Sequence, residues 1–221
     1  KTRAAGNYMI GADHFITPAH TVGVLFSGQR TDLLSDENNS TRISNNTLLD
    51  SNILMSSDEE RSVTNASFNL NYKGVFDGKR ELTVDLDYFT YERASMEYLQ
   101  NEFLKANMDA YRAPRRFQNN SPSDISITSA RAGYVVPITA GSTLDAGFRT
   151  SLVESRNNRI FNNYSGDNWV RDAGKSDEFN FSERITAIYL TYKNNLSRRT
   201  ELEAGLRAED TRTRSKSLTT P

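Results

Sequence analysis

The chain has 221 residues and a formal net charge of −1, with 25% charged residues, 36% hydrophobic residues and no cysteine. The near-neutral charge argues against nucleic acid as a partner, because a phosphate-binding domain is expected to be basic. The lack of cysteine excludes a disulfide framework and thiolate-bound zinc. No apolar run approaches the length of a transmembrane helix, but average hydropathy does not detect membrane strands, of which only alternate residues contact lipid.

Eight stretches have the composition of β-strands and are separated by clusters of glycine, proline, asparagine and charged residues. They are Ala4–Ile16, His20–Asp32, Arg61–Phe76, Arg80–Arg93, Ile125–Pro137, Ser142–Arg156, Phe179–Asn195 and Thr200–Thr213. Most reach about ten residues, the length that a tilted strand needs to cross a bilayer, whereas strands of globular proteins usually have about five or six.

The connections between these stretches alternate in length. Short connections at 17–19, 77–79, 138–141 and 195–199 alternate with three long polar ones at 35–52, 96–124 and 157–177. Long loops without structure are uncommon in compact soluble domains, whereas tight turns at one end and long loops at the other are typical of outer-membrane barrels. We therefore predict an all-β fold: an antiparallel up-and-down meander of about eight long strands, forming a segment of a transmembrane β-barrel.

One segment departs from this pattern. Glu97–Tyr111 has helix-forming residues at helical spacing and is followed by Pro114. The sequence leaves two interpretations open, a short helix within the loop or an irregular loop with one helical turn.

Alternation within the strands predicts which side chains meet lipid. The residues expected to face lipid are Leu82, Val84, Leu86, Leu202, Ala204 and Leu206. Those expected to face the lumen are Asp85, Asp87, Arg149, Glu201, Glu203 and Arg207. A soluble sandwich also alternates, so the alternative is a soluble extracellular β-sheet binding module, for example one that binds carbohydrate, in which the apolar faces pack together.

Five segments carry a resemblance to a known family. They are YMIGADHFITPAHTVGV, KRELTVDLDYFTYE, NNSPSDISITSARAGYVVPI, LDAGFRTSLVESRNN and AIYLTYKNNLSRRTELEAGLRAEDTRTRS. In order and spacing they resemble the outer-membrane β-barrel domain of TonB-dependent receptor-like proteins from Gram-negative bacteria. The resemblance implies a location in the cell outer membrane, a barrel of many strands, a plug domain in the lumen, and nutrient import driven by an inner-membrane energy-coupling complex.

The chain also departs from the pattern of that family. It has about eight predicted strands where a plugged transporter has about twenty-two, and it shows no plug domain, no coupling motif and no closing strand with a terminal aromatic residue. We therefore expect residues 1–221 to be a single segment of a larger barrel. The expected partners are outer-membrane lipid, the energy-coupling complex through the plug region of the parent protein, and a small ligand that the sequence does not identify.

Residues with catalytic or metal-binding chemistry are scarce, so we expect neither an enzyme nor a cofactor. The sequence contains no G-x-S-x-G nucleophile elbow and no phosphate-binding glycine loop. His14 and His20 flank a turn, but no third metal ligand lies near them in sequence. The carboxylate pairs Asp85/Asp87 and Glu201/Glu203 fit a solvated lumen, balanced by arginines such as Arg149 and Arg207, better than acid/base chemistry.

The segment NNYSGDNWV is the candidate ligand-binding region. It brings Tyr164, Asp167, Asn168 and the single tryptophan, Trp169, together in one long loop. Aromatic rings beside amide and carboxylate groups suit a sugar or peptide ligand. The other interpretation is that Trp169 anchors its loop on a neighbouring loop or strand end.

Overall fold

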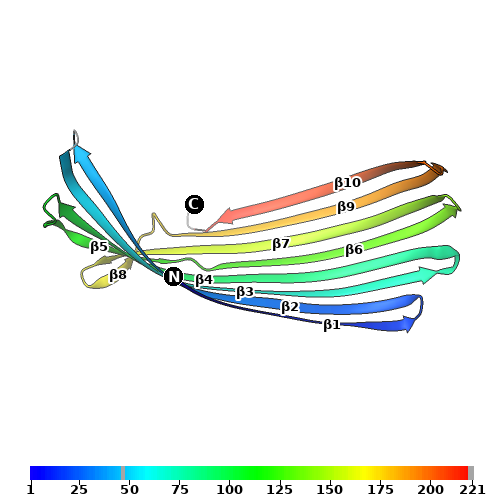
Figure 1. Cartoon of the computed structure of the whole chain (residues 1–221), viewed down its shortest axis with the longest axis horizontal. Coiled ribbons are helices and arrows are strands. Elements are labelled where there is room, and N and C mark those ends of the chain that lie inside the picture. The colour runs from blue at the N-terminus through cyan, green and yellow to red at the C-terminus, as the bar shows by residue number, and fades with distance from the viewer. Residues whose placement is uncertain (46–47, 219–221) are drawn as a thin grey trace.

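The computed structural model describes residues 1–45 and 48–218, which form one antiparallel sheet of ten strands (Figure 1). The strands are β1 (Thr2–Thr17), β2 (His20–Asn45), β3 (Leu48–Phe76), β4 (Arg80–Lys105), β5 (Ala110–Asn120), β6 (Ser123–Thr139), β7 (Ser142–Ser165), β8 (Asn168–Arg171), β9 (Asp177–Ser197) and β10 (Thr200–Ser217). A single 3₁₀ turn, η1 (Asp77–Lys79), joins β3 to β4, and no α-helix occurs in the described part of the chain. The prediction of an all-β antiparallel meander is confirmed.

The strands follow chain order across the sheet, with one branching point at β4. The half of β4 nearer its turn with β3 pairs with β6, while its far half pairs with β5. Strand β7 then pairs with both β5 and β6 on one side and with β9 on the other, and β8 pairs only with the far end of β7. Strands β1 and β10 form the two edges of the sheet (Figure 1).

Short turns gather at one end of the sheet, which we call the turn end (Figure 1). Besides η1, two-residue turns join β1 to β2, β6 to β7 and β9 to β10. In each of these three, a hydroxyl side chain before the turn accepts a hydrogen bond from the backbone N–H two residues later: Thr17, Thr139 and Ser197, at 3.2, 3.3 and 3.2 Å. Such local bonds favour turns and explain why the strands reverse at these points.

The opposite end, which we call the distal end, differs from the prediction. The expected long loops at 35–52, 96–124 and 157–177 are wrong, because β2, β3, β4 and β7 continue into them and β5 and β8 are two further strands within them. Residues 46 and 47 of the first expected loop lie outside the described residues. Hairpins that extend beyond the rest of the sheet take the place of loops, as the blue and cyan hairpin β2–β3 shows (Figure 1).

The expected helical turn in Glu97–Tyr111 is also wrong. Residues 97–105 belong to β4, and a short turn at 106–109 leads into β5. Met108 has a φ of 68° in that turn, and Asp109 accepts a hydrogen bond from Asn107 Nδ2 at 2.7 Å. Pairing with β3 on one side and β5 on the other outweighs the local helical propensity of this segment.

The sheet is a single layer and has almost no apolar core. Among the described residues the only buried hydrophobic side chain is Ala187, at 2% exposure, while many large apolar side chains are exposed. A soluble domain of this length would bury a large apolar core. The alternative of a two-layer sandwich is therefore wrong, because residues 1–45 and 48–218 form one sheet that leaves the apolar side chains uncovered.

Candidate functional site

The strand register divides the side chains into two faces, which we name after two neighbours on β4. Residues directly opposite each other in an antiparallel pair lie on the same face, so the pairing can be followed from strand to strand. The Leu86 face includes Leu70 on β3 and Ala130 on β6, which both pair with Leu86. The Asp85 face includes Asn71 and Arg131, the partners of Asp85.

The Leu86 face carries a continuous band of apolar side chains in the half of the sheet nearer the turn end. The band is made of Ile10, Val24, Phe26, Phe68, Leu70, Leu82, Val84, Leu86, Ala130, Ala132, Ala146, Phe148, Ile188, Leu190, Leu202, Ala204 and Leu206. Many of these side chains are exposed, up to 59% at Ile188 and 81% at Leu206, and others, such as Leu70 and Leu82, are half-buried. An apolar surface that spans all the long strands is typical of the lipid-facing side of a membrane barrel.

A row of tyrosines marks the edge of this band near the turn end and shows how the strands tilt. Tyr72 lies in the same cross-strand row as Ala132, and Tyr134 is two residues nearer the turn end than Ala132. Tyr134 in turn lies in the row of Leu190, and Tyr192 is two residues nearer the turn end than Leu190. The edge thus moves by one residue per strand, which at about 3.3 Å per residue and about 4.8 Å between strands is a tilt of about 35°.

This tilt and the aromatic edge agree with the geometry of membrane barrels. Strands of outer-membrane barrels tilt by roughly 35–45°, and aromatic residues form girdles at the borders of the apolar band. The cross-strand row that starts at Ile10 on β1 ends at Arg212 on β10, so one row of the sheet passes from the apolar band into a charged region. The band therefore runs diagonally across the strands, as it must if the strands cross a flat bilayer at an angle.

The Asp85 face carries a network of polar side chains behind the apolar band. Arg131 Nη2 donates a hydrogen bond to Asp85 Oδ2 at 2.8 Å. Asp87 accepts hydrogen bonds from Asn69 Nδ2 at 2.7 Å and from Ser129 Oγ at 3.0 Å. These bonds link β3, β4 and β6, so the two carboxylates hold neighbouring strands together instead of standing free for acid/base chemistry.

The residues predicted to face lipid and lumen fall on opposite faces. The register places Leu82, Val84, Leu86, Leu202, Ala204 and Leu206 together on the Leu86 face. It places Asp85, Asp87, Arg149, Glu201, Glu203 and Arg207 together on the Asp85 face. Contact of these sets with lipid and with the lumen stays a prediction.

The expected charge partners on the Asp85 face are wrong in one respect. We expected Arg149 and Arg207 to balance the carboxylates, but Asp85 pairs with Arg131. Glu203 pairs with Lys193 at 3.3 Å, and Arg207 with its own neighbour Glu209 at 2.6 Å. The sequence could not show this, because the partner of each carboxylate depends on the strand register.

Close packing of tyrosine against glycine, which the sequence analysis did not detect, joins neighbouring strands. A Cβ atom at Gly147 would overlap the ring of Tyr189, which lies directly opposite on β9. Tyr8 lies against Gly28 in the same way on the opposite face. The signal that could have predicted these contacts is a tyrosine in one predicted strand that comes to lie opposite a glycine when the two strands of a hairpin or neighbouring strands are paired.

A second polar cluster lies towards the distal end of the Asp85 face, outside the apolar band. Glu59 accepts a hydrogen bond from Arg61 Nη2 at 2.7 Å and one from Ser95 Oγ at 2.8 Å, and Arg93 lies 3.9 Å away. Burial raises the pKa of Glu59, but the hydrogen bonds from Arg61 and Ser95 and the two arginine charges outweigh it. The net pKa of this carboxyl is therefore below its ordinary value.

The four predicted ligand-binding residues form the hairpin of β7 and β8. Tyr164 pairs directly with Trp169, and their rings pack edge to face with centroids 5.2 Å apart. Asp167 occupies the turn with a φ of 64°, and Asn168 Nδ2 donates to the carbonyl of Gly166 at 3.1 Å. Trp169 also lies 6.2 Å from the ring of Tyr98 on β4, which favours the anchoring interpretation over a free binding site.

The histidines and carboxylates do not converge. His20 lies 2.7 Å from the hydroxyl of Tyr72 and packs edge to face on Phe76. His14 sits opposite Val22 within the apolar region of β1 and β2. Within the residues that the structure describes, no group of three metal-ligating side chains comes together.

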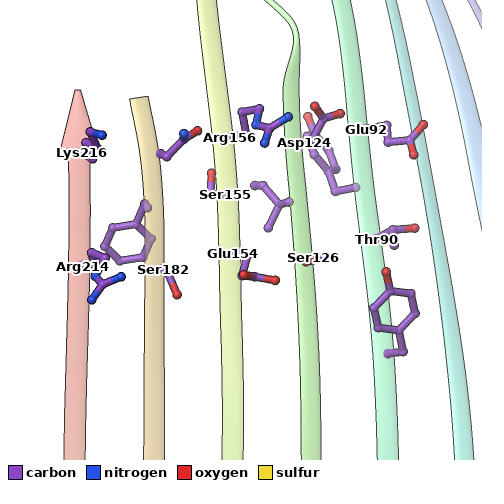
Figure 2. A pocket seen from close by; sticks show the side chains of 15 residues that line it. Thr90, Glu92, Asp124, Ser126, Glu154, Ser155, Arg156, Ser182, Arg214 and Lys216 are labelled. Atoms are coloured by element: carbon purple, nitrogen blue, oxygen red, sulfur yellow. The ribbon is translucent and has the colours of Figure 1, made fainter. Parts of the chain in front are cut away.

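A shallow groove of about 570 Å³ crosses the Leu86 face just beyond the apolar band (Figure 2). Its charged lining comes from four strands: Glu92 on β4, Asp124 on β6, Glu154 and Arg156 on β7, and Arg214 and Lys216 on β10. The groove marks where the lipid-like surface changes to a charged one. The described residues contain no helix long and apolar enough to span a membrane.

A single tilted sheet with an apolar band on one face and a polar network on the other defines the wall of a membrane-spanning β-barrel. A model of the outer membrane protein β-barrel family matches residues 73–221, which is more than half of the chain. The chain therefore belongs to the outer membrane protein β-barrel family, and its location is the outer membrane. No curated protein matches it.

Residues 1–72 lie outside the matched range but continue the same structure. Strands β1 and β2 and most of β3 extend the sheet without a break, and Ile10, Phe26 and Phe68 extend the apolar band. The apolar band therefore extends from β1 to β10.

Proposed function

We propose that this barrel is part of a TonB-dependent receptor-like protein that takes up a small nutrient across the outer membrane without covalent chemistry. The observation that carries the proposal is the hydrogen-bonded polar network on the Asp85 face, behind the apolar band. A wall with charged and amide groups on its inner side suits a water-filled lumen or a polar plug domain better than a lumen closed by apolar side chains. The resemblance of the strand sequences to TonB-dependent receptor-like proteins supplies the energy-coupling part of the proposal.

The proposed ligand is a small polar nutrient, without assignment to one chemical class. Sugar, siderophore, peptide and cobalamin importers share one architecture, and a fold does not determine which ligand is handled. The aromatic hairpin with Tyr164 and Trp169 is the part of the described chain where a sugar or peptide would stack on rings.

The test compares growth of a wild-type strain with that of a strain lacking the full-length gene. Each strain receives iron chelates, oligosaccharides, peptides or cobalamin as the limiting nutrient. We expect the strain lacking the gene to lose growth on one nutrient class. Returning the gene should restore growth, but not in a strain whose energy-coupling complex is inactivated. Equal growth on every class, with the barrel correctly inserted, would contradict uptake.

Correct insertion is measured separately by membrane fractionation and by electrophoresis of heated and unheated samples. A protein recovered in the outer membrane whose mobility changes on heating is a folded barrel. This measurement separates failure of transport from failure of assembly.

A further inference from the structure

The charged region beyond the apolar band contains a regular group of basic side chains. On each of three neighbouring strands, an arginine lies on the Leu86 face four residues beyond the last apolar residue: Arg156 after Leu152 on β7, Arg184 after Ile188 on β9, and Arg212 after Ala208 on β10. Arg214 and Lys216 follow Arg212 on the same face of β10. We call these five residues, Arg156, Arg184, Arg212, Arg214 and Lys216, the cationic patch.

The charges of the patch are poorly balanced within the described chain. Only Arg212 forms an ion pair there, with Asp210 at 2.9 Å, whereas Arg156, Arg184, Arg214 and Lys216 form none with any described residue. Arg184 and Arg212 lie directly opposite each other, an arrangement of like charges that destabilises a sheet unless an anion bridges them.

Acidic side chains also occur in this region, both on the strands of the patch and to one side of it. The same stretches of β7, β9 and β10 carry Glu154, Glu178 and Asp210 on this face, so that five cations face three carboxylates. Asp124, opposite Arg156 on β6, lies on the side away from β10, and Figure 2 shows it beside Arg156, far from Arg214 and Lys216. The formal charges on this face cancel within β7 and within β9, so the net positive charge lies on β10, where three cations face Asp210.

The position of the patch relative to the bilayer follows from the tilt of the strands. Four residues at about 3.3 Å each, on strands tilted by about 35°, place the arginine Cα atoms about 11 Å beyond the apolar band along the membrane normal. Long arginine and lysine side chains can reach back from there to the headgroup layer. Since short turns face the periplasm in outer-membrane barrels, this border meets the outer leaflet.

We infer that the cationic patch binds the phosphate groups of a phosphorylated lipid headgroup in the outer leaflet of the outer membrane. Guanidinium groups bind phosphate oxygens in pairs of parallel hydrogen bonds, and arginines spread over three adjacent strands offer several such donors to one headgroup. Continuity with the apolar band favours a lipid over a free anion, because the acyl chains of that lipid would lie on Leu152, Ile188 and Leu190 next to the patch. This inference rests on the outer-membrane location and is independent of the proposed uptake.

The test uses the full-length protein reconstituted in vesicles of phosphatidylcholine, with or without bisphosphorylated lipid A. The measured quantity is the temperature at which the folded form converts to the unfolded form on electrophoresis. A ligand that binds only the folded state raises this temperature. We expect lipid A to raise it by several degrees in the wild type, and the rise to shrink in high salt.

The variant Arg184→Gln/Arg214→Gln removes two cations of the patch, and Arg198→Gln/Arg199→Gln is its matched control. The control changes the same residue type in the same β9–β10 hairpin but at the turn end. We expect the control to keep the rise caused by lipid A and the patch variant to lose most of it. If the double patch variant does not fold in phosphatidylcholine alone, Lys216→Gln takes its place and should show a smaller loss.

Three results would overturn the inference. One is an equal rise with lipid A in the wild type and the patch variant. Another is an equal loss in the patch variant and the turn-end control, which would show a general effect of net charge. The third is a full rise with inorganic phosphate in phosphatidylcholine vesicles, which would show a site for free anions instead of a lipid surface.

Discussion

The two halves of this sheet differ in which kind of side chain they expose and which kind they bury. Near the turn end, large apolar side chains such as Leu206 and Ile188 are exposed, whereas near the distal end the buried side chains are polar, among them Ser35, Ser57 and Ser95. The same β-strands run through both halves, so the backbone conformation does not cause the difference. The difference is the one expected if lipid surrounds the first half and water the second.

Different interactions hold the strands in register in the two halves. The turn-end half has alternating apolar and polar residues, which fix the register because a slip by one residue would turn the apolar set away from lipid. The distal half lacks this pattern and relies on hydrogen bonds between side chains, such as Ser57 Oγ donating to Glu97 at 2.8 Å. Substitutions in the two halves should therefore have different effects.

The largest effect is expected from a charge placed in the apolar band. Leu86→Arg in the full-length protein should destabilise the folded barrel by roughly 2 to 4 kcal/mol, because the residue lies well inside the band and the charge would meet lipid. The matched control is Thr83→Arg on the Asp85 face of the same strand. Unfolding by urea in lipid vesicles measures both, and equal losses would show that the assigned faces are wrong.

The next effect is expected where a tyrosine packs on a glycine. Gly147→Ala should cost about 1 to 3 kcal/mol, because the new methyl group overlaps the ring of Tyr189 and forces it to move. Gly6→Ala is the control, since no atom lies within 4 Å of a Cβ built at that glycine. The same urea experiment compares them, and a neutral Gly147→Ala would mean that Tyr189 moves away without cost.

The sequence predicted the turn-end half of the fold better than the distal half. In the turn-end half, the alternation of Leu82, Val84 and Leu86 with Asp85 and Asp87 predicts a strand with one apolar and one polar face. The strand register places these residues on two opposite faces, as predicted. The stretch 35–52 has no such alternation, because most of its residues are polar, and it was therefore predicted as a loop. Backbone pairing with a neighbouring strand makes it a strand, and single-sequence patterns do not show that pairing.

The sequence predicted which face of the sheet each site residue lies on, but not which residue on another strand it contacts. The two predicted sets of six residues lie on opposite faces because that depends only on local alternation. The partner of Asp85, Arg131, is 46 residues away in the chain, and that of Trp169, Tyr98, is 71 residues away. Such contacts require the register of several strands, which tertiary structure determines.

A smaller effect is expected in the distal polar cluster. Glu59→Gln should weaken the distal β3–β4 pairing by about 1 to 2 kcal/mol, because a neutral amide no longer compensates Arg61 and Arg93. Hydrogen exchange of the β3 and β4 backbone measures this loss locally. Glu60→Gln is the control, since the neighbouring Glu60 is exposed on the opposite face.

The same cluster predicts a dependence on pH. The folded-state pKa of Glu59 is lowered, so its contribution is fully present above the ordinary glutamate value and is lost as the pH falls through the lower folded-state value. The protection of distal β3 amides, taken relative to the intrinsic exchange rate at each pH, should therefore fall in acid below about pH 4, more in the wild type than in Glu59→Gln. An equal acid response in both proteins would assign the effect to other carboxylates.

The most local effect, confined to one hairpin, is expected at the distal tip. Trp169→Ala removes ring contacts with Tyr164 and Tyr98, and should cost about 0.5 to 1.5 kcal/mol for each lost ring pair in addition to the lost apolar contact area. Because the tip lies beyond the apolar band, insertion and heat modifiability should stay unchanged while exchange of the β7–β8 hairpin becomes faster. If Trp169→Ala abolished uptake of a nutrient and left this exchange unchanged, the tryptophan would be a ligand contact and not an anchor.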